Sequence, residues 1–323
     1  MSVWFRSGSI PARLAAGLAA IPLFMAMSLV SGSACSKNKN EVPAVANAAP
    51  ASGADTPTPT AAGETGGNKD DTTPPPGVDI TKLDDFERKV FFRVLNKEAS
   101  ACGKGHSLMV SLRTDKGCRK SLYAARYVAR LVDGGFTDSE ISESLQKRFR
   151  SERHRLNLAD APVKGNPAAP VTVVEFVDYE CPHCKRVQPV LRQVLDDYKD
   201  EVKVAFKHYP LGSHTNARIA AEAAIAAHKQ GKFWAYNEKV WAISESITPA
   251  ALEQIAKEVG LDVAKWRADL ESDDVRAWVD RDHGEGQTLG IDHTPTIYIN
   301  GREFTDPRDA DSMRDWINEE LNR

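Results

Sequence analysis

The sequence has no excess of basic residues. Its 42 Lys and Arg residues are balanced by 45 Asp and Glu residues, which gives a formal net charge of -3. Domains that bind nucleic acids usually carry a strong basic surplus, so the composition argues against that class of protein. Hydrophobic residues make up 41% and charged residues 27% of the 323 residues. This composition is typical of a soluble globular protein with one large domain or two smaller ones.

Cysteine is also scarce, with only five residues in the chain. Cys181 and Cys184 form one Cys-x-x-Cys pair, and the sequence contains no second pair of this kind. A structural zinc site needs a second pair of ligands, so we expect no metal. Attachment of a c-type haem requires His directly after the second cysteine, where this chain has Lys185.

Residues 1–35 have the pattern of an export signal. Arg6 and Arg13 give a positive start, an apolar run covers residues 14–30, and small residues lead to Cys35. We expect a signal peptide of the lipoprotein type, in which Cys35 becomes the lipidated first residue. The alternative is an uncut membrane anchor. Both interpretations place the rest of the chain in the periplasm or on the outside of the cell envelope, anchored to the membrane, where disulfides persist.

Residues 36–79 contain many Ala, Pro, Thr and Gly residues and almost no large apolar ones. Such a segment cannot form a core, so we expect a disordered linker. Residues 80–158 then show helical periodicity. Apolar side chains recur at helical spacing over 86–95 and 121–132, and Thr137 begins a capping-box pattern three residues before a Glu. We therefore predict a small helical module.

This predicted module contains Cys102 and Cys118. In an oxidising compartment the leading interpretation is a structural disulfide, and a loop of this length contributes about 3 kcal/mol in the chain-entropy model. The alternative is a second redox pair that relays electrons.

Residues 159–323 have the pattern of an α/β domain with the order β-α-β, a helical insert, then β-β-α. Strands are indicated by β-branched and aromatic residues, and helices by longer apolar periodicity. The expected segments are strands at 171–179, 202–210 and 296–300, a helix at 182–198, several helices at about 213–290, a short strand after the Asn300-Gly301 turn, and a final helix.

The Cys181-Pro182-His183-Cys184 motif follows the first of these strands directly. We predict Cys181 at the N-cap of the next helix, with Pro182 in the first turn, where proline is well tolerated. Free N–H groups and the partial positive charge at a helix N-terminus lower the pKa of a thiol there. His183 would add to this effect. A pair with one stabilised thiolate readily passes its disulfide to another protein.

Three segments of this domain resemble the DsbA-like branch of the thioredoxin superfamily. They are 175–184 with the CPHC motif, 214–234, and 290–301. The resemblance implies a thioredoxin-like fold with an inserted helical domain. It also implies an enzyme that exchanges disulfides through the Cys181–Cys184 pair, without any other cofactor.

The resemblance further assigns roles to individual residues. It implies that Pro295, preceded by Thr294, is cis and lies beside the reactive cysteines, where the backbone can pair with a substrate chain. It implies that Glu175 lies beneath the active site and moves protons to and from Cys184. Lys207 is a candidate partner of Glu175, although an ordinary ion pair at a strand edge is the alternative.

Asp178 and Glu180, which precede the motif, are expected to be solvated or loop residues. His214 is expected to cap or pack rather than to act as a ligand.

The leading functional hypothesis is an exported dithiol oxidase that donates its disulfide through a mixed disulfide on Cys181. One alternative is a disulfide isomerase or reductase of the same fold, and another is a tethered peptide-binding protein without turnover. The expected partners are exported proteins with cysteine thiols and a membrane redox partner that recycles the cysteine pair.

Overall fold

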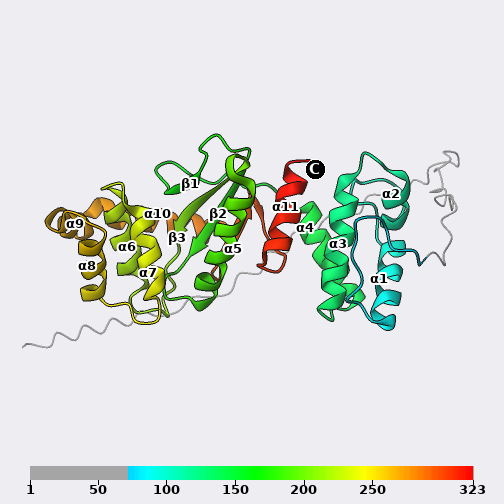
Figure 1. Cartoon of the computed structure of the whole chain (residues 1–323), viewed down its shortest axis with the longest axis horizontal. Helices are drawn as coiled ribbons and strands as arrows, with labels where there is room; N and C mark the ends of the chain where they lie inside the picture. Colours follow the sequence, from blue (N-terminus) through cyan, green and yellow to red (C-terminus); the bar gives the residue numbers. More distant parts are fainter. Residues whose placement is uncertain (1–71, 323) are drawn as a thin grey trace, which may run out of the picture. The chain divides into compact units, whose positions relative to one another are not determined.

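The computed structural model describes residues 72–322, which belong to one compact unit (Figure 1). The predicted signal peptide, Cys35 and most of the predicted linker lie outside the described residues. None of the helices within 72–322 has the length and apolarity that a membrane span requires.

Helices α1 to α4 form an N-terminal module around a core in which Phe91, Leu95 and Val128 are fully buried. The short helix α2 was not predicted from the sequence. It begins after Ser107, whose side chain accepts a hydrogen bond from a backbone N–H of the first turn. The ordered core also starts earlier than predicted, since Val78 is only 7% exposed. The bounds are α1 Asp85–Lys97, α2 Leu108–Thr114, α3 Arg119–Asp133 and α4 Asp138–Arg150.

Capping boxes start two of these helices. At α1 the Glu87 N–H donates to the Asp84 side chain, and the Asp84 N–H donates to the Glu87 carboxylate, both over 2.8 Å. Thr137 and Glu140 form the same reciprocal arrangement at α4, which confirms the capping box predicted there. These bonds satisfy N–H groups that would otherwise have no partner at a helix N-terminus.

A five-stranded sheet with the order β1-β3-β2-β4-β5 forms the centre of the second part of the chain. Strands β2 and β3 are parallel, and β4 is antiparallel to β2. The predicted hairpin is confirmed, because β4 and β5 pair as antiparallel strands. The turn that joins them consists of Asn300 and Gly301, with φ of 47° and 79°. The edge strand β1 was missed, since three residues are too few to show alternation. The bounds are β1 Val163–Gly165, β2 Val171–Val177, β3 Val202–His208, β4 Thr296–Ile299 and β5 Arg302–Glu303.

Helices α5 (Pro182–Tyr198) and α11 (Ala310–Glu320) pack on one face of this sheet. Val173 and Ile297 from the sheet share a buried cluster with Leu191 of α5 and Trp316 of α11. A short 3-10 turn, η1 (Lys199–Glu201), links α5 to β3. The packing fixes the direction of α5 relative to β2, and therefore the place where its N-terminus meets the end of the strand.

The predicted helical insert separates β3 from β4. Its helix α6 packs closely against α7, α9 and α10, because most of its buried side chains are alanines. Trp241 of the insert shares one buried cluster with Tyr179 and Cys184, so the insert covers the cysteine motif from one side. The bounds are α6 Ala217–His228, α7 Phe233–Ala242, α8 Pro249–Glu258, α9 Val263–Leu270 and α10 Asp273–Thr288.

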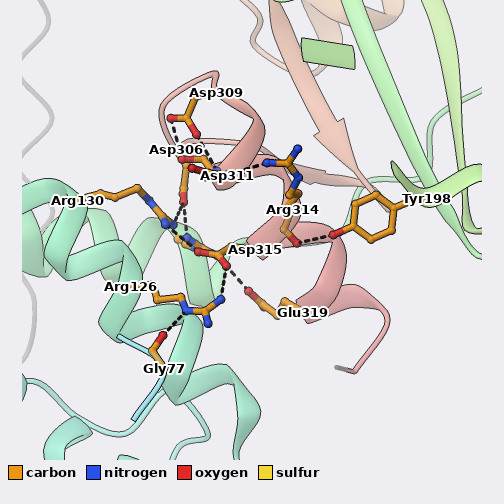
Figure 2. Close-up of polar contacts among 12 residues, drawn as sticks. Gly77, Arg126, Arg130, Tyr198, Asp306, Asp309, Asp311, Arg314, Asp315 and Glu319 are labelled. Atoms are coloured by element: carbon orange, nitrogen blue, oxygen red, sulfur yellow. Dashed lines mark hydrogen bonds and ion pairs between the residues drawn. The ribbon is translucent and has the colours of Figure 1, made fainter. Parts of the chain in front are cut away.

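A network of buried ion pairs joins the N-terminal module to α11. Arg130 of α3 reaches Asp306 over 3.1 Å and Asp315 over 2.7 Å (Figure 2). Arg148 of α4 is fully buried and pairs with Asp306 and, over 3.3 Å, with Glu319. Because each of these charges has a partner of opposite sign, the interface avoids the cost of an isolated buried charge.

Candidate active site

The cysteine motif lies where β2 ends and α5 begins (Figure 1). The Cys181 N–H donates to the backbone oxygen of Asp178 over 3.1 Å, which closes the turn that leads out of the strand. Cys181 is the N-cap of α5, and Pro182 is the first residue of the helix. Proline suits this position because an N–H there would have no partner within the helix.

The two sulfurs of the motif are free thiols in this structure and have very different properties. The pKa of Cys181 is lowered to about 4, first by a hydrogen bond from the Cys184 thiol and then by donors from Thr294 and from the backbone of Cys184 and His183. Burial is the main cause that raises the pKa of Cys184 far above its ordinary range. At neutral pH the pair therefore consists of a Cys181 thiolate and a protonated Cys184 thiol.

Pro295 lies beside the first cysteine. The Thr294–Pro295 peptide bond is cis, and the Thr294 backbone oxygen is 3.3 Å from the Cys181 sulfur. Arg308 donates to the Pro295 backbone oxygen over 2.9 Å, which ties this loop to the segment before α11. The structure therefore brings together two segments that are more than a hundred residues apart in sequence.

Glu175 lies on β2, on the face of the sheet that α5 covers, and is 1% exposed. Burial raises its pKa to about 8, and a hydrogen bond from Gln188 partly offsets this effect. The Gln188 Nε2 is 3.0 Å from the Glu175 carboxylate and 3.3 Å from the backbone oxygen of Cys184. A small cavity of about 30 Å³ is lined by Glu175 and Gln188. Glu175 is therefore a protonated acid at neutral pH, one hydrogen-bonded side chain away from the second cysteine.

The suggested pairing of Glu175 with Lys207 was wrong. Glu175 is in register with Phe206, whereas Lys207 is in register with Phe176. Neighbouring residues of a strand point to opposite faces, so Lys207 lies on the other side of the sheet. There its Nζ is 2.8 Å from Asp282 and 2.6 Å from Glu285 on α10.

Asp178 lies in the loop after β2, as one of the two expectations for it had it, but it is not solvated, since it is only 2% exposed. It accepts hydrogen bonds from the backbone N–H groups of Glu180 and Leu211 over 2.8 and 2.7 Å, and its carboxylate is 2.8 Å from His214 Nδ1. Burial raises the pKa of Asp178 despite these contacts. The residue holds the loop after β3 against the turn before the motif. Glu180 is partly exposed and accepts from the backbone N–H of Asn216 over 2.7 Å.

The exposed His183 side chain has a partner that the sequence reasoning did not consider. Arg186, one turn along α5, donates to His183 Nδ1 over 2.6 Å. Only the backbone of His183 is among the main causes of the low Cys181 pKa. The imidazole therefore has a smaller part in that effect than expected.

Sequence reasoning also missed Gln188. The signal was present, because Gln188 follows Cys184 by four residues, and this spacing places both on the same face of a helix. A polar residue on the otherwise apolar inner face of α5 needs a buried partner, and Glu175 provides it.

Among residues 72–322 no group of three or more His, Cys, Asp or Glu side chains is arranged to hold a metal ion. The sequence-based expectation that no metal takes part stays a prediction.

Comparisons with known proteins identify the family. The thioredoxin family model matches residues 158–319. The oxidised form of BdbD from Bacillus subtilis aligns with a TM-score of 0.50 and 28% identity, over 54% of this chain and 99% of that one. A thioredoxin-like oxidoreductase from Silicibacter pomeroyi aligns with a TM-score of 0.46 and 27% identity, over 55% of this chain and 98% of that one.

Among curated proteins, the Na(+)/H(+) antiporter NhaA 3 of Salinispora tropica is 35% identical over 152 residues, which are 47% of this chain and 23% of that protein. This chain therefore spans less than a quarter of the length of that relative. The chain belongs to the thioredoxin family.

Proposed function

We propose that this protein is an exported dithiol oxidase that donates the Cys181–Cys184 disulfide to proteins with free thiols. The observation that carries the proposal is the contrast between the two sulfurs, with the pKa of Cys181 at about 4 and that of the buried Cys184 raised. A strongly stabilised thiolate favours the reduced form of the pair, and the disulfide form is then an oxidant.

The reaction has two steps. A thiolate of the target attacks the Cys181 sulfur, the Cys181–Cys184 bond breaks, and the electron pair leaves on Cys184. Glu175, which keeps its proton up to a pH of about 8 and lies near Cys184, is the proposed source of the proton that Cys184 takes up. A second target thiolate then attacks the target sulfur of the mixed disulfide and releases Cys181 as a thiolate. The target gains a disulfide, and the enzyme gains two electrons.

The segment around Thr294 and Pro295 is the proposed binding site for the target chain. Its backbone lies next to the Cys181 sulfur, so an extended target could pair with it while its cysteine reaches that sulfur. We also propose that a membrane redox partner reoxidises the cysteine pair, and that a lipid on Cys35 anchors the protein at the outer side of a membrane.

A redox titration against glutathione tests the direction of exchange. The state of Cys181 and Cys184 is read at the peptide level by alkylation and mass spectrometry, so that Cys102 and Cys118 do not contribute. An oxidase is expected to have a potential well above the value of about -270 mV that is typical of thioredoxin, and closer to about -120 mV. A potential near that of thioredoxin would refute the oxidase and favour a reductase.

A trapping experiment tests the roles of the two cysteines. The Cys184→Ala variant should accumulate mixed disulfides through Cys181, because the sulfur that resolves them is missing. The matched Cys181→Ala variant should not, since Cys184 is fully buried. Equal trapping by both variants would contradict the assignment, as would a lack of trapping by either, which is the result expected of a peptide-binding protein without turnover.

A further inference from the structure

A second cysteine pair lies in the N-terminal module, where a disulfide joins Cys102 to Cys118. Its two sulfur-bearing residues differ in access. Cys102 is exposed and is followed in the loop by Gly103 and Gly105, around which an added Cβ would meet no other atom. Cys118 is only 7% exposed. An attacking thiolate from another molecule would therefore reach Cys102 and not Cys118.

Cys118 is placed to leave as a thiolate. It is the N-cap of α3, a helix of 15 residues, and no side chain caps that end. The unpaired N–H groups and the partial positive charge of a helix N-terminus stabilise a thiolate. The Ser121 hydroxyl, one turn further along α3, is 3.0 Å from the Cys118 sulfur. Exposed disulfides with such surroundings are typical of exchangeable bonds rather than of inert ones.

The hydrogen-bond acceptor of the Ser121 hydroxyl depends on whether the Cys102–Cys118 pair is oxidised or reduced. Its oxygen is 2.8 Å from that of Ser111, which donates in turn to the Asp115 carboxylate over 2.9 Å. Asp115 is ionised, since a hydrogen bond from Lys104 is the main cause that lowers its pKa to about 2. In the disulfide the Cys118 sulfur is a weak acceptor, so Ser121 can donate to Ser111. A Cys118 thiolate is a stronger acceptor, and the same hydroxyl can turn to it.

We propose that Cys102–Cys118 is a second thiol–disulfide exchange site, whose reductant is a protein dithiol. One thiolate of that dithiol attacks the Cys102 sulfur, the bond to Cys118 breaks, and the electron pair leaves on Cys118, where α3 and Ser121 stabilise it. The second thiolate of the partner then attacks the partner's own sulfur in the mixed disulfide. Cys102 is released and takes a proton from water. The partner is oxidised to a disulfide, and the pair has gained two electrons.

Reduced glutathione is the probe for the first step, because its single thiol forms a mixed disulfide that an acid quench traps before a second glutathione can resolve it. The full chain with Cys181→Ser and Cys184→Ser is incubated with it under native conditions, quenched with acid and mapped by mass spectrometry. We expect glutathione on Cys102 and a free Cys118. An adduct on Cys118 instead, or reduction that occurs only after a denaturant is added, would overturn the proposal.

Two serine variants in the same background test the stabilisation of Cys118. A hydrogen bond to a charged group contributes about 1.5 to 3 kcal/mol, so Ser121→Ala should lower the equilibrium constant for reduction of the pair by glutathione at least about ten-fold. The matched variant Ser111→Ala removes the competing acceptor and should not lower it. If the Cys102–Cys118 disulfide has a purely structural role, the two variants should have the same equilibrium constant for reduction when their folding stabilities are equal. That result would refute the proposal. The adduct map of the unchanged module does not depend on whether either variant folds.

Discussion

Replacing Glu175 by Gln should change how the stability of the protein depends on pH. The carboxyl group has an ordinary pKa of 4.5 in the unfolded chain and a pKa of about 8 when buried in the folded one. Between these values the unfolded chain has lost a proton that the folded chain keeps. The free energy of unfolding therefore falls as pH rises from about 4.5 to about 8, and this contribution is constant outside that window.

The magnitude follows from the same two pKa values. One pH unit corresponds to about 1.4 kcal/mol, so the full window is equivalent to about 5 kcal/mol. The glutamine of the Glu175→Gln variant cannot ionise, and its amide has nearly the same shape as the protonated acid. Relative to this variant, the wild-type protein should therefore become less stable by about 5 kcal/mol between a pH of about 4.5 and a pH of about 8.

The assay is denaturant unfolding of both proteins at several pH values, with the Cys181–Cys184 disulfide closed. Closing the disulfide removes the Cys181 thiol, whose low pKa would add a pH dependence of the opposite sign to the curve of each protein. The quantity compared is the difference between the two proteins, in which the other titrating groups cancel. If the two curves run parallel across the whole window between the two pKa values, Glu175 is not a buried acid with a raised pKa, and its proposed part in proton transfer fails with it.

Three further predictions concern neighbouring groups. Alkylation of reduced Cys181 by iodoacetamide should keep a constant rate down to a pH of about 5 and fall below its pKa of about 4, and a midpoint near 8 would contradict the stabilised thiolate. Gln188→Leu should move the upper end of the Glu175 window to higher pH, because the variant loses the Gln188 hydrogen bond that lowers the Glu175 pKa in the wild-type protein. The same unfolding titration measures the pH range of this window, and an unmoved window would show that the bond is unimportant. Arg148→Met should destabilise the protein by about 3 to 5 kcal/mol in denaturant unfolding, because Asp306 is left buried without its closest partner, and a loss under about 1 kcal/mol would contradict that account.

The sequence predicted those features that depend on neighbours within a few residues. The strand that runs into Cys181, the proline at the start of the next helix, the Thr137 capping box and the Asn300-Gly301 hairpin are all present. Each of these features rests on backbone hydrogen bonds or turn geometry that local residue types determine. The short elements β1 and α2 were not predicted, because they contain too few residues for a strand or helix periodicity to be recognised.

The partner of Glu175 shows where local reasoning failed. The sequence indicated correctly that Glu175 and Lys207 lie in two strands with large buried side chains. The face on which each points depends on the register between β2 and β3, and a shift of one residue reverses it. That register is set by packing of the whole sheet against α5, α11 and α10, which the pattern within one strand does not contain.

The sequence by itself therefore determined that a Cys-x-x-Cys motif stands at the N-terminus of a helix after a buried strand. Only the tertiary structure decided what surrounds the two sulfurs. It brings Thr294, whose side chain helps to lower the pKa of Cys181, to that sulfur across 113 residues, and it encloses Cys184 and Glu175 so that their protons are held. The physical reason is that a thiol or a carboxyl acquires an unusual pKa from desolvation and from distant donors, and both depend on how separate elements pack.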